Sequence, residues 1–239
     1  MPVRPSGLAR AIECAASVWL PDTGTPEDPN RYQYECDRGT EIHAWWESLV
    51  GSDPLPPPIK PELHAVWLAE AERVDPGGYA ELHLLLYDRG GQPHVLQGEK
   101  EAEPPVLPGA RFIMRGSIDR AGRDNGKGVP WVEDLKTGRR LVSPRSWQHQ
   151  SYGLCVWVYV GRPACGVQSS TLTWPRDLRH EGQATRRFAK LTPGDFYNVW
   201  QTILKTHARV EAREPPRPNP ECGLCSVASS CPALNGAPF

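Results

Sequence analysis

The sequence predicts an α/β protein in which a small mixed central sheet is flanked by helices. Apolar residues recur at helical spacing towards both ends of the chain, whereas residues 79–136 carry short runs with the pattern of strands. The 239 residues suffice for one domain with its own core, and contents of 39% hydrophobic and 23% charged residues are typical of globular proteins.

Three helices are expected before the sheet. Ser6 is a candidate N-cap for a short helix that ends near Cys14. Residues 21–30, rich in Pro and Asp, predict a loop, and residues 38–50 and 62–74 predict two longer helices. The apolar positions of the helix 38–50 have helical spacing: Ile42, Trp45, Trp46 and Leu49.

The middle of the chain predicts four strands. The part after it predicts a helix, one further strand and a second helix. Strands are expected at residues 79–87, 94–100, 111–120 and 129–136, and we interpret them as an antiparallel meander. Ser143-Pro144 favours the start of a helix that runs to about residue 160. A strand at 166–174, a helix opened by Thr192-Pro193-Gly194-Asp195 that runs to about residue 212, and a stiff linker at 215–220 complete the prediction.

An Asp at the end of one predicted strand and an Asp-x-Lys on the next form a candidate metal site. Side chains alternate along a strand, so Asp134 and Lys136 share one face while Glu133 and Leu135 take the other. If the strands pair as a hairpin, Asp119 approaches Asp134, and two carboxylates suit Mg²⁺ or Mn²⁺. Such an ion supports phosphodiester hydrolysis, with Lys136 orienting water or stabilising charge. The same short pattern also occurs in surface ion pairs.

In motif order the chain resembles the RecB-like branch of the PD-(D/E)XK nucleases, which includes CRISPR-associated exonucleases and nuclease domains of bacterial recombination machines. Four motifs, which span most of the chain, carry the resemblance. They are Arg38-Gly39-Thr40-Glu41-Ile42-His43, Gly116-Ser117-Ile118-Asp119, Glu133-Asp134-Leu135-Lys136-Thr137-Gly138, and Gln148 with Tyr152 as Gln-x-x-x-Tyr. The resemblance implies a restriction-endonuclease-like core.

The resemblance also implies roles for individual residues. His43, Asp119, Asp134 and the backbone carbonyl of Leu135 are the implied ligands of Mg²⁺ or Mn²⁺. The implied catalytic residues are Asp119, Asp134, Lys136, Gln148 and Tyr152. Without the family, His43 is a single histidine on an amphipathic helix, and Gln148 and Tyr152 merely share a helix face. An acidic residue before the second motif is also expected, with Glu99 and Glu101 as alternatives.

Three of the seven cysteines, Cys222, Cys225 and Cys231, lie within ten residues near the end of the chain. This spacing favours a metal site, which needs a fourth ligand. In iron-sulfur members of the resembled branch one cysteine lies near the N-terminus, so Cys14 is implied as the fourth ligand of a 4Fe-4S cluster. Zinc is the alternative metal, and Cys36 is the alternative fourth ligand. Cys155 and Cys165, in apolar surroundings, are interpreted as buried hydrophobes.

The expected organisation is one nuclease domain, residues 1–239, with a core at 38–213. Residues 1–37 and 214–239 together form the cluster-binding cap. The net charge of −1 demands no polyanionic partner, although residues 136–145 and 176–190 are locally basic. No long apolar run indicates a membrane segment, and we expect a cytoplasmic protein.

The expected function is a Mg²⁺- or Mn²⁺-dependent deoxyribonuclease that acts as an exonuclease on single-stranded or frayed DNA ends. The resemblance implies DNA as a partner, together with a CRISPR integrase or a recombination or helicase complex. The biological setting would then be CRISPR spacer acquisition, recombination or phage DNA processing. The alternative is a subunit that binds DNA through an iron-sulfur or zinc centre and does not cleave it.

Overall fold

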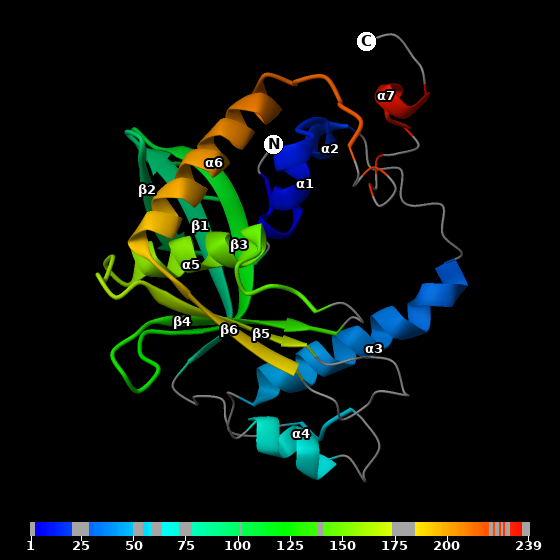
Figure 1. Cartoon of the computed structure of the whole chain (residues 1–239), viewed down its shortest axis with the longest axis vertical. Coiled ribbons are helices and arrows are strands. Elements are labelled where there is room, and N and C mark those ends of the chain that lie inside the picture. Colours follow the sequence, from blue (N-terminus) through cyan, green and yellow to red (C-terminus); the bar gives the residue numbers. More distant parts are fainter. Residues whose placement is uncertain are drawn as a thin grey trace.

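A computed structural model of the chain has a central sheet with helices on both sides (Figure 1). It describes residues 3–20, 29–49, 55–58, 64–71, 78–100, 102–137, 141–173, 185–219, 222, 225, 227 and 230–235. Several residues singled out in the sequence lie outside the described part: Glu101, Arg139, Arg140, Arg176, Arg179 and the side chain of Cys36.

The sheet has six strands in the order β2-β1-β3-β4-β5-β6. Their bounds are β1 Tyr79–Arg89, β2 Gln92–Gln97, β3 Arg111–Gly122, β4 Trp131–Lys136, β5 Val167–Thr173 and β6 Thr185–Leu191. The first four strands pair antiparallel as expected, but the expected meander was wrong, because β3 pairs with β1 and not with β2. β5 pairs parallel with β4. A parallel pair needs a long crossover, and the helix between β4 and β5 provides it.

The helices are α1 Leu8–Glu13, α2 Ala16–Trp19, α3 Pro29–Ser48, α4 His64–Ala71, α5 Trp147–Tyr159, α6 Pro193–Glu211 and α7 Pro232–Asn235, with a 3-10 turn η1 at Pro5–Gly7. Figure 1 shows α5 and α6 together on one side of the sheet, with α1 beside them, and α3 on the other side of β4 to β6. The core lies between the sheet and α1, α5 and α6.

Several expected helix starts were wrong. α3 begins at Pro29 instead of residue 38, since proline suits the first turn of a helix. Ser6 lies inside η1, so Gly7 is the N-cap of α1. Ser143 accepts a turn hydrogen bond from the N–H of Ser146, which is the actual N-cap of α5.

The expected start of α6 is confirmed by its cap. The Thr192 hydroxyl accepts from the N–H of Asp195, whose carboxylate accepts from the Thr192 N–H at 2.7 Å. This capping box satisfies two backbone donors that a helix start otherwise leaves without partners. α6 therefore starts at the residue after Thr192 and runs along the core to Glu211.

The N-terminal segment and the end of α6 both lie beside the core. Val3 forms a parallel bridge to Met114 on β3, and the ring of Pro5 lies against Gly116. At the other end, Arg209 of α6 donates to the carbonyl of Ile12 at 2.6 Å, and the chain then returns past α1 and α2 (Figure 1). In the described part of the chain, no helix is long and apolar enough to cross a membrane.

Candidate active site

Side chains from α3, β3, β4, α5 and the N-terminal turn meet around an open cleft of about 380 Å³. The cleft contains every catalytic residue and every Mg²⁺ or Mn²⁺ ligand that the resemblance implied. Its lining consists of Ser6, His43, Asp119, Asp134, Leu135, Lys136, Thr137, Gln148 and Tyr152.

Two carboxylates face each other across β3 and β4. Arg120 pairs with Glu133, so Asp119 and Asp134 are neighbours at the next position of the antiparallel pair. Burial raises the pKa of Asp119 to about 7, and the charge of Asp134 adds to this shift. The Leu135 N–H opposes it by donating to Asp119 Oδ2 at 2.6 Å. Two carboxylates that repel each other in a partly buried cleft favour binding of a cation.

His43 reaches this pair from α3. Its Nδ1 lies 3.8 Å from Asp119 Oδ1. Burial lowers the pKa of His43, while the charge of Asp134 acts in the opposite direction. A lowered pKa favours the neutral imidazole, which is the form that binds metals.

Lys136, Gln148 and Tyr152 form a polar network on Asp134. The Lys136 ammonium lies 2.6 Å from Asp134 Oδ2 and donates to Gln148 Oε1 at 3.2 Å. Gln148 Nε2 lies 3.3 Å from Asp134 Oδ1 and 3.1 Å from the Tyr152 hydroxyl. Residues four apart share one helix face, which is why α5 presents both Gln148 and Tyr152 to the cleft. Burial raises the pKa of Tyr152, so its hydroxyl stays protonated.

Glu133 lies away from the cleft, as strand alternation predicts. Its carboxylate pairs with Arg186 of β6 at 3.1 Å and accepts from the Ser170 hydroxyl at 3.0 Å. Arg120, opposite Glu133 in the sheet, lies over the ring of Trp46 on α3. This buried polar cluster links β3, β4, β5 and β6 to the helix that carries His43.

His149 is a buried neighbour of the site that the sequence did not single out. Its Nε2 lies 3.7 Å from Asp134 Oδ2, and its Nδ1 contacts the Ser146 hydroxyl at 2.8 Å. It is fully buried, and burial lowers its pKa. A histidine directly after the motif glutamine was the available signal, but one histidine in an apolar helix is usually a packing residue.

Glu81 is a second residue that the sequence missed. It lies on β1 between Ala80 and Leu82. Ala80 pairs with Arg120 of β3 and Leu82 pairs with Ile118, so Glu81 lies opposite Asp119. Its φ of 44° is in the left-handed region, where a residue other than glycine is strained and functional residues are frequent.

Glu81 is a third candidate for the acidic residue expected before the second motif, beside Glu99 and Glu101. Its charge contributes to the raised pKa of Asp119, after burial and the charge of Asp134. Neither Glu81 nor the exposed Glu99 lines the cleft, and Glu101 is outside the described part. The Glu81 carboxylate lies 3.3 Å from the Lys100 ammonium and 3.6 Å from His83 Nε2.

The donors around the cleft suit a hard divalent cation, since they comprise two carboxylates, an imidazole and nearby backbone carbonyls. Their present arrangement is looser than a metal site. Within the described residues, no three His, Cys, Asp or Glu side chains are arranged to hold one ion. The Lys136 ammonium lies beside Asp134 Oδ2, although this close pair lacks hydrogen-bond geometry.

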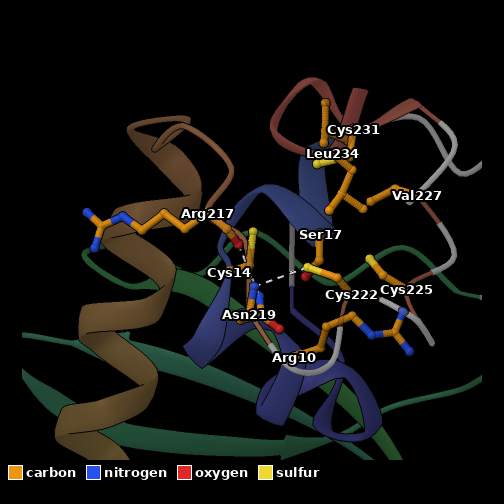
Figure 2. A pocket seen from close by; sticks show the side chains of 11 residues that line it. Arg10, Cys14, Ser17, Arg217, Asn219, Cys222, Cys225, Val227, Cys231 and Leu234 are labelled. Carbon is orange, nitrogen blue, oxygen red and sulfur yellow. Dashed lines mark hydrogen bonds between the residues drawn. The ribbon is translucent and has the colours of Figure 1, made fainter. Parts of the chain in front are cut away.

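The four cysteines predicted as ligands line one small pocket, in which Cys14 meets three cysteines from more than 200 positions later in the sequence (Figure 2). Cys14 is the C-cap of α1, and Cys222, Cys225 and Cys231 come from the segment after α6. The backbone N–H of Asn219 donates to Cys222 Sγ at 3.2 Å. In Figure 2 the four side chains surround a common space.

The cysteine pocket is narrow, with a volume of about 20 Å³, which is room for one water molecule. Four thiolates are a donor set for zinc or for a cubane cluster. Among the described residues no three His, Cys, Asp or Glu side chains are arranged to hold one ion, so binding of either metal requires the thiols to rearrange. Cys155 is buried as expected, which raises its pKa to about 12, whereas Cys165 is only partly buried.

A family model of the PD-(D/E)XK nuclease superfamily matches residues 4–232. The chain belongs to this superfamily. PD-(D/E)XK proteins are generally metal-dependent nucleases that typically use Mg²⁺ or Mn²⁺, and the mixed sheet with flanking helices fits their fold. A solved structure titled "Crystal structure of SSO0001" is similar with a TM-score of 0.45 and 14% identity, covering 98% of this chain and 86% of that one. No curated protein matches the chain.

Proposed function

We propose that this PD-(D/E)XK protein is a Mg²⁺- or Mn²⁺-dependent deoxyribonuclease. The supporting observation is the single cleft that brings the carboxylates Asp119 and Asp134 together with His43, Lys136 and Gln148. These residues come from four elements spread over more than 100 positions of sequence. A chance surface ion pair between Asp134 and Lys136 would not account for the other three.

Each residue has a distinct proposed task. Asp119, Asp134, His43 and the carbonyl of Leu135 would hold the cation, which when bound supplies an activated water and neutralises charge on the phosphate. Lys136 orients the water or stabilises the charge that develops on the phosphate oxygens. Gln148, held by the Tyr152 hydroxyl, keeps the Lys136 ammonium directed into the cleft.

We also propose exonuclease action on single-stranded or frayed DNA ends. The support is the resemblance to RecB-like nucleases in the order and spacing of the four motifs. The same resemblance supports a role in CRISPR spacer acquisition, recombination or phage DNA processing, with an integrase or a helicase complex as partner.

The cysteine pocket is proposed to bind a metal centre that fastens a cap, residues 1–37 and 214–239, to the core at 38–213. Four thiols from both ends of the chain around one space support this proposal. The resemblance favours a 4Fe-4S cluster, and zinc is the alternative for a four-thiol donor set. Visible absorbance of anaerobically purified protein, with iron and zinc analysis, distinguishes them.

The second candidate is a metal-bearing DNA-binding subunit that does not cleave. The cysteine pocket would serve it equally well, because a structural centre needs no catalytic residues. The complete set of side chains in the cleft argues for the nuclease.

Degradation of end-labelled single-stranded DNA with Mn²⁺ separates the two candidates. We expect Lys136→Ala to reduce the rate by at least about 100-fold, because it removes a charge next to the reacting phosphate. Lys127→Ala is the matched control, since Lys127 is exposed in the turn between β3 and β4. Wild-type protein that binds DNA and leaves it intact would support the non-cleaving subunit.

A further inference from the structure

A second hollow of about 400 Å³ lies beside the N-terminal segment and has a different lining from the cleft. Its described lining residues include two arginines and an aromatic ring and no carboxylate: Val3, Arg4, Pro104, Phe112 and Arg115. The volume is within the range of small-ligand sites, about 300 to 1,000 Å³. None of these residues has a role in the site described above.

The walls of the hollow are fixed by specific contacts. Arg115 donates to the backbone carbonyls of Lys100 and Ala102, which holds the segment that carries Pro104. The Tyr87 hydroxyl donates to the carbonyl of Pro105 at 2.9 Å, and the Tyr87 ring meets Phe112 edge-on. The aromatic ring and the guanidinium are therefore positioned before any ligand arrives.

The N-terminal segment contributes residues to both the hollow and the catalytic cleft. In the N-terminal segment, Arg4 lines the hollow and Ser6 lines the cleft. Arg115 lies four residues before Asp119 on β3, roughly 13 Å along the strand at about 3.3 Å per residue. A chain bound at Asp119 that follows the N-terminal segment from Ser6 to Arg4 can thus reach the hollow.

We propose that this hollow is a subsite for a nucleotide of single-stranded DNA that lies a few positions from the scissile phosphate. Arg4, which is exposed, would contact a phosphate, and Phe112 would stack on a base. Proteins that bind single strands combine such cations with aromatic stacking platforms. The inference rests on the proposed nuclease function and adds where the rest of the substrate binds.

The subsite is tested by the affinity for a labelled thymidine oligonucleotide of about 12 nucleotides, measured by fluorescence anisotropy in EDTA, where no cleavage occurs. We expect Arg4→Ala to weaken binding several-fold. The slope of log affinity against log salt concentration should fall by about one, which corresponds to one lost phosphate contact. Phe112→Leu should weaken binding by roughly 5- to 100-fold.

Two variants serve as matched controls. Lys127→Ala removes an exposed cation far from the hollow, and Phe188→Leu changes an aromatic that is 61% exposed on β6. Neither should alter the affinity. If Phe112→Leu fails to fold, Arg4→Ala decides alone, because the exposed Arg4 side chain contributes no core contact.

The subsite inference is wrong if Arg4→Ala and Phe112→Leu bind as tightly as the wild type, or if the controls weaken binding equally. Weaker binding by these two variants alone supports it. Cleavage with Mn²⁺ is measured in parallel. Wild-type protein that shows the subsite effects but leaves DNA intact would refute the nuclease proposal and leave the binding inference standing.

Discussion

Asp119→Asn is expected to stabilise the metal-free protein while it abolishes DNA cleavage. Burial and the charge of Asp134 raise the pKa of Asp119 from 3.8 to about 7. The folded state therefore holds this proton more tightly than the unfolded state. The free energy of unfolding should fall as pH rises between about 4 and 7, and the full cost of ionisation is present above about 7.

The magnitude follows from the size of the shift. A shift of one pKa unit corresponds to about 1.4 kcal/mol, so a shift of about three units sets a ceiling of roughly 4 kcal/mol. The Asp119 side chain is 20% exposed, which allows some solvent screening, and we expect about 2 to 4 kcal/mol at pH 8. Asparagine keeps an oxygen for the Leu135 N–H, so that hydrogen bond should survive.

Urea unfolding of both proteins in EDTA at about pH 5 and pH 8 measures the effect. The free energy of unfolding of the Asn variant should exceed that of the wild type at pH 8. At pH 5 most of this difference should be lost. Added Mn²⁺ should stabilise the wild type more than the variant, because binding to the folded state adds stability. Unfolding free energies that differ by the same amount at both pH values would refute the electrostatic explanation.

Three further predictions concern the cleft, the cysteine pocket and a helix cap. Tyr152→Phe removes the hydroxyl that holds Gln148, so the cleavage rate should fall roughly 5-fold, which corresponds to about 1 kcal/mol. Single-turnover kinetics measures this rate, and its dependence on Mn²⁺ concentration should be unchanged. Cys225→Ser should lower the metal content of the purified protein and the melting temperature together, and metal analysis with unchanged content would contradict the ligand assignment. Thr192→Ala should reduce the unfolding free energy by about 1 kcal/mol through loss of the cap on α6, with unchanged cleavage as the check.

Much of the fold followed from local patterns in the sequence. The strands β1 to β4 and the cap of α6 were predictable because alternation and capping residues act over a few positions. The pairing of β3 with β1 instead of β2 was not, because it joins strands that are not consecutive in the chain. β6 was not predicted, since its residues Thr185–Leu191 are largely exposed at the sheet edge and lack a buried alternating face. The early start of α3 at Pro29 was missed because the Pro-rich segment before it has the composition of a loop.

The site was predictable where the signal lay within one strand or helix. Strand alternation separated Asp134 from Glu133, and helix spacing joined Gln148 to Tyr152. Glu81 depends on the register between β1 and β3, which no short pattern contains. The meeting of Cys14 with the other cysteines similarly required the resemblance, because it depends on how both chain ends pack beside the core.

The central claim is that the cleft around Asp134 hydrolyses DNA with a divalent cation. The most direct measurement is the degradation rate of end-labelled single-stranded DNA by wild type and Asp134→Ala, each with Mn²⁺ and with EDTA. We predict degradation by the wild type with Mn²⁺ only, and a loss of at least about 100-fold in a variant whose circular dichroism shows that it is folded. Equal degradation by both proteins, or undiminished degradation in EDTA, would contradict the account.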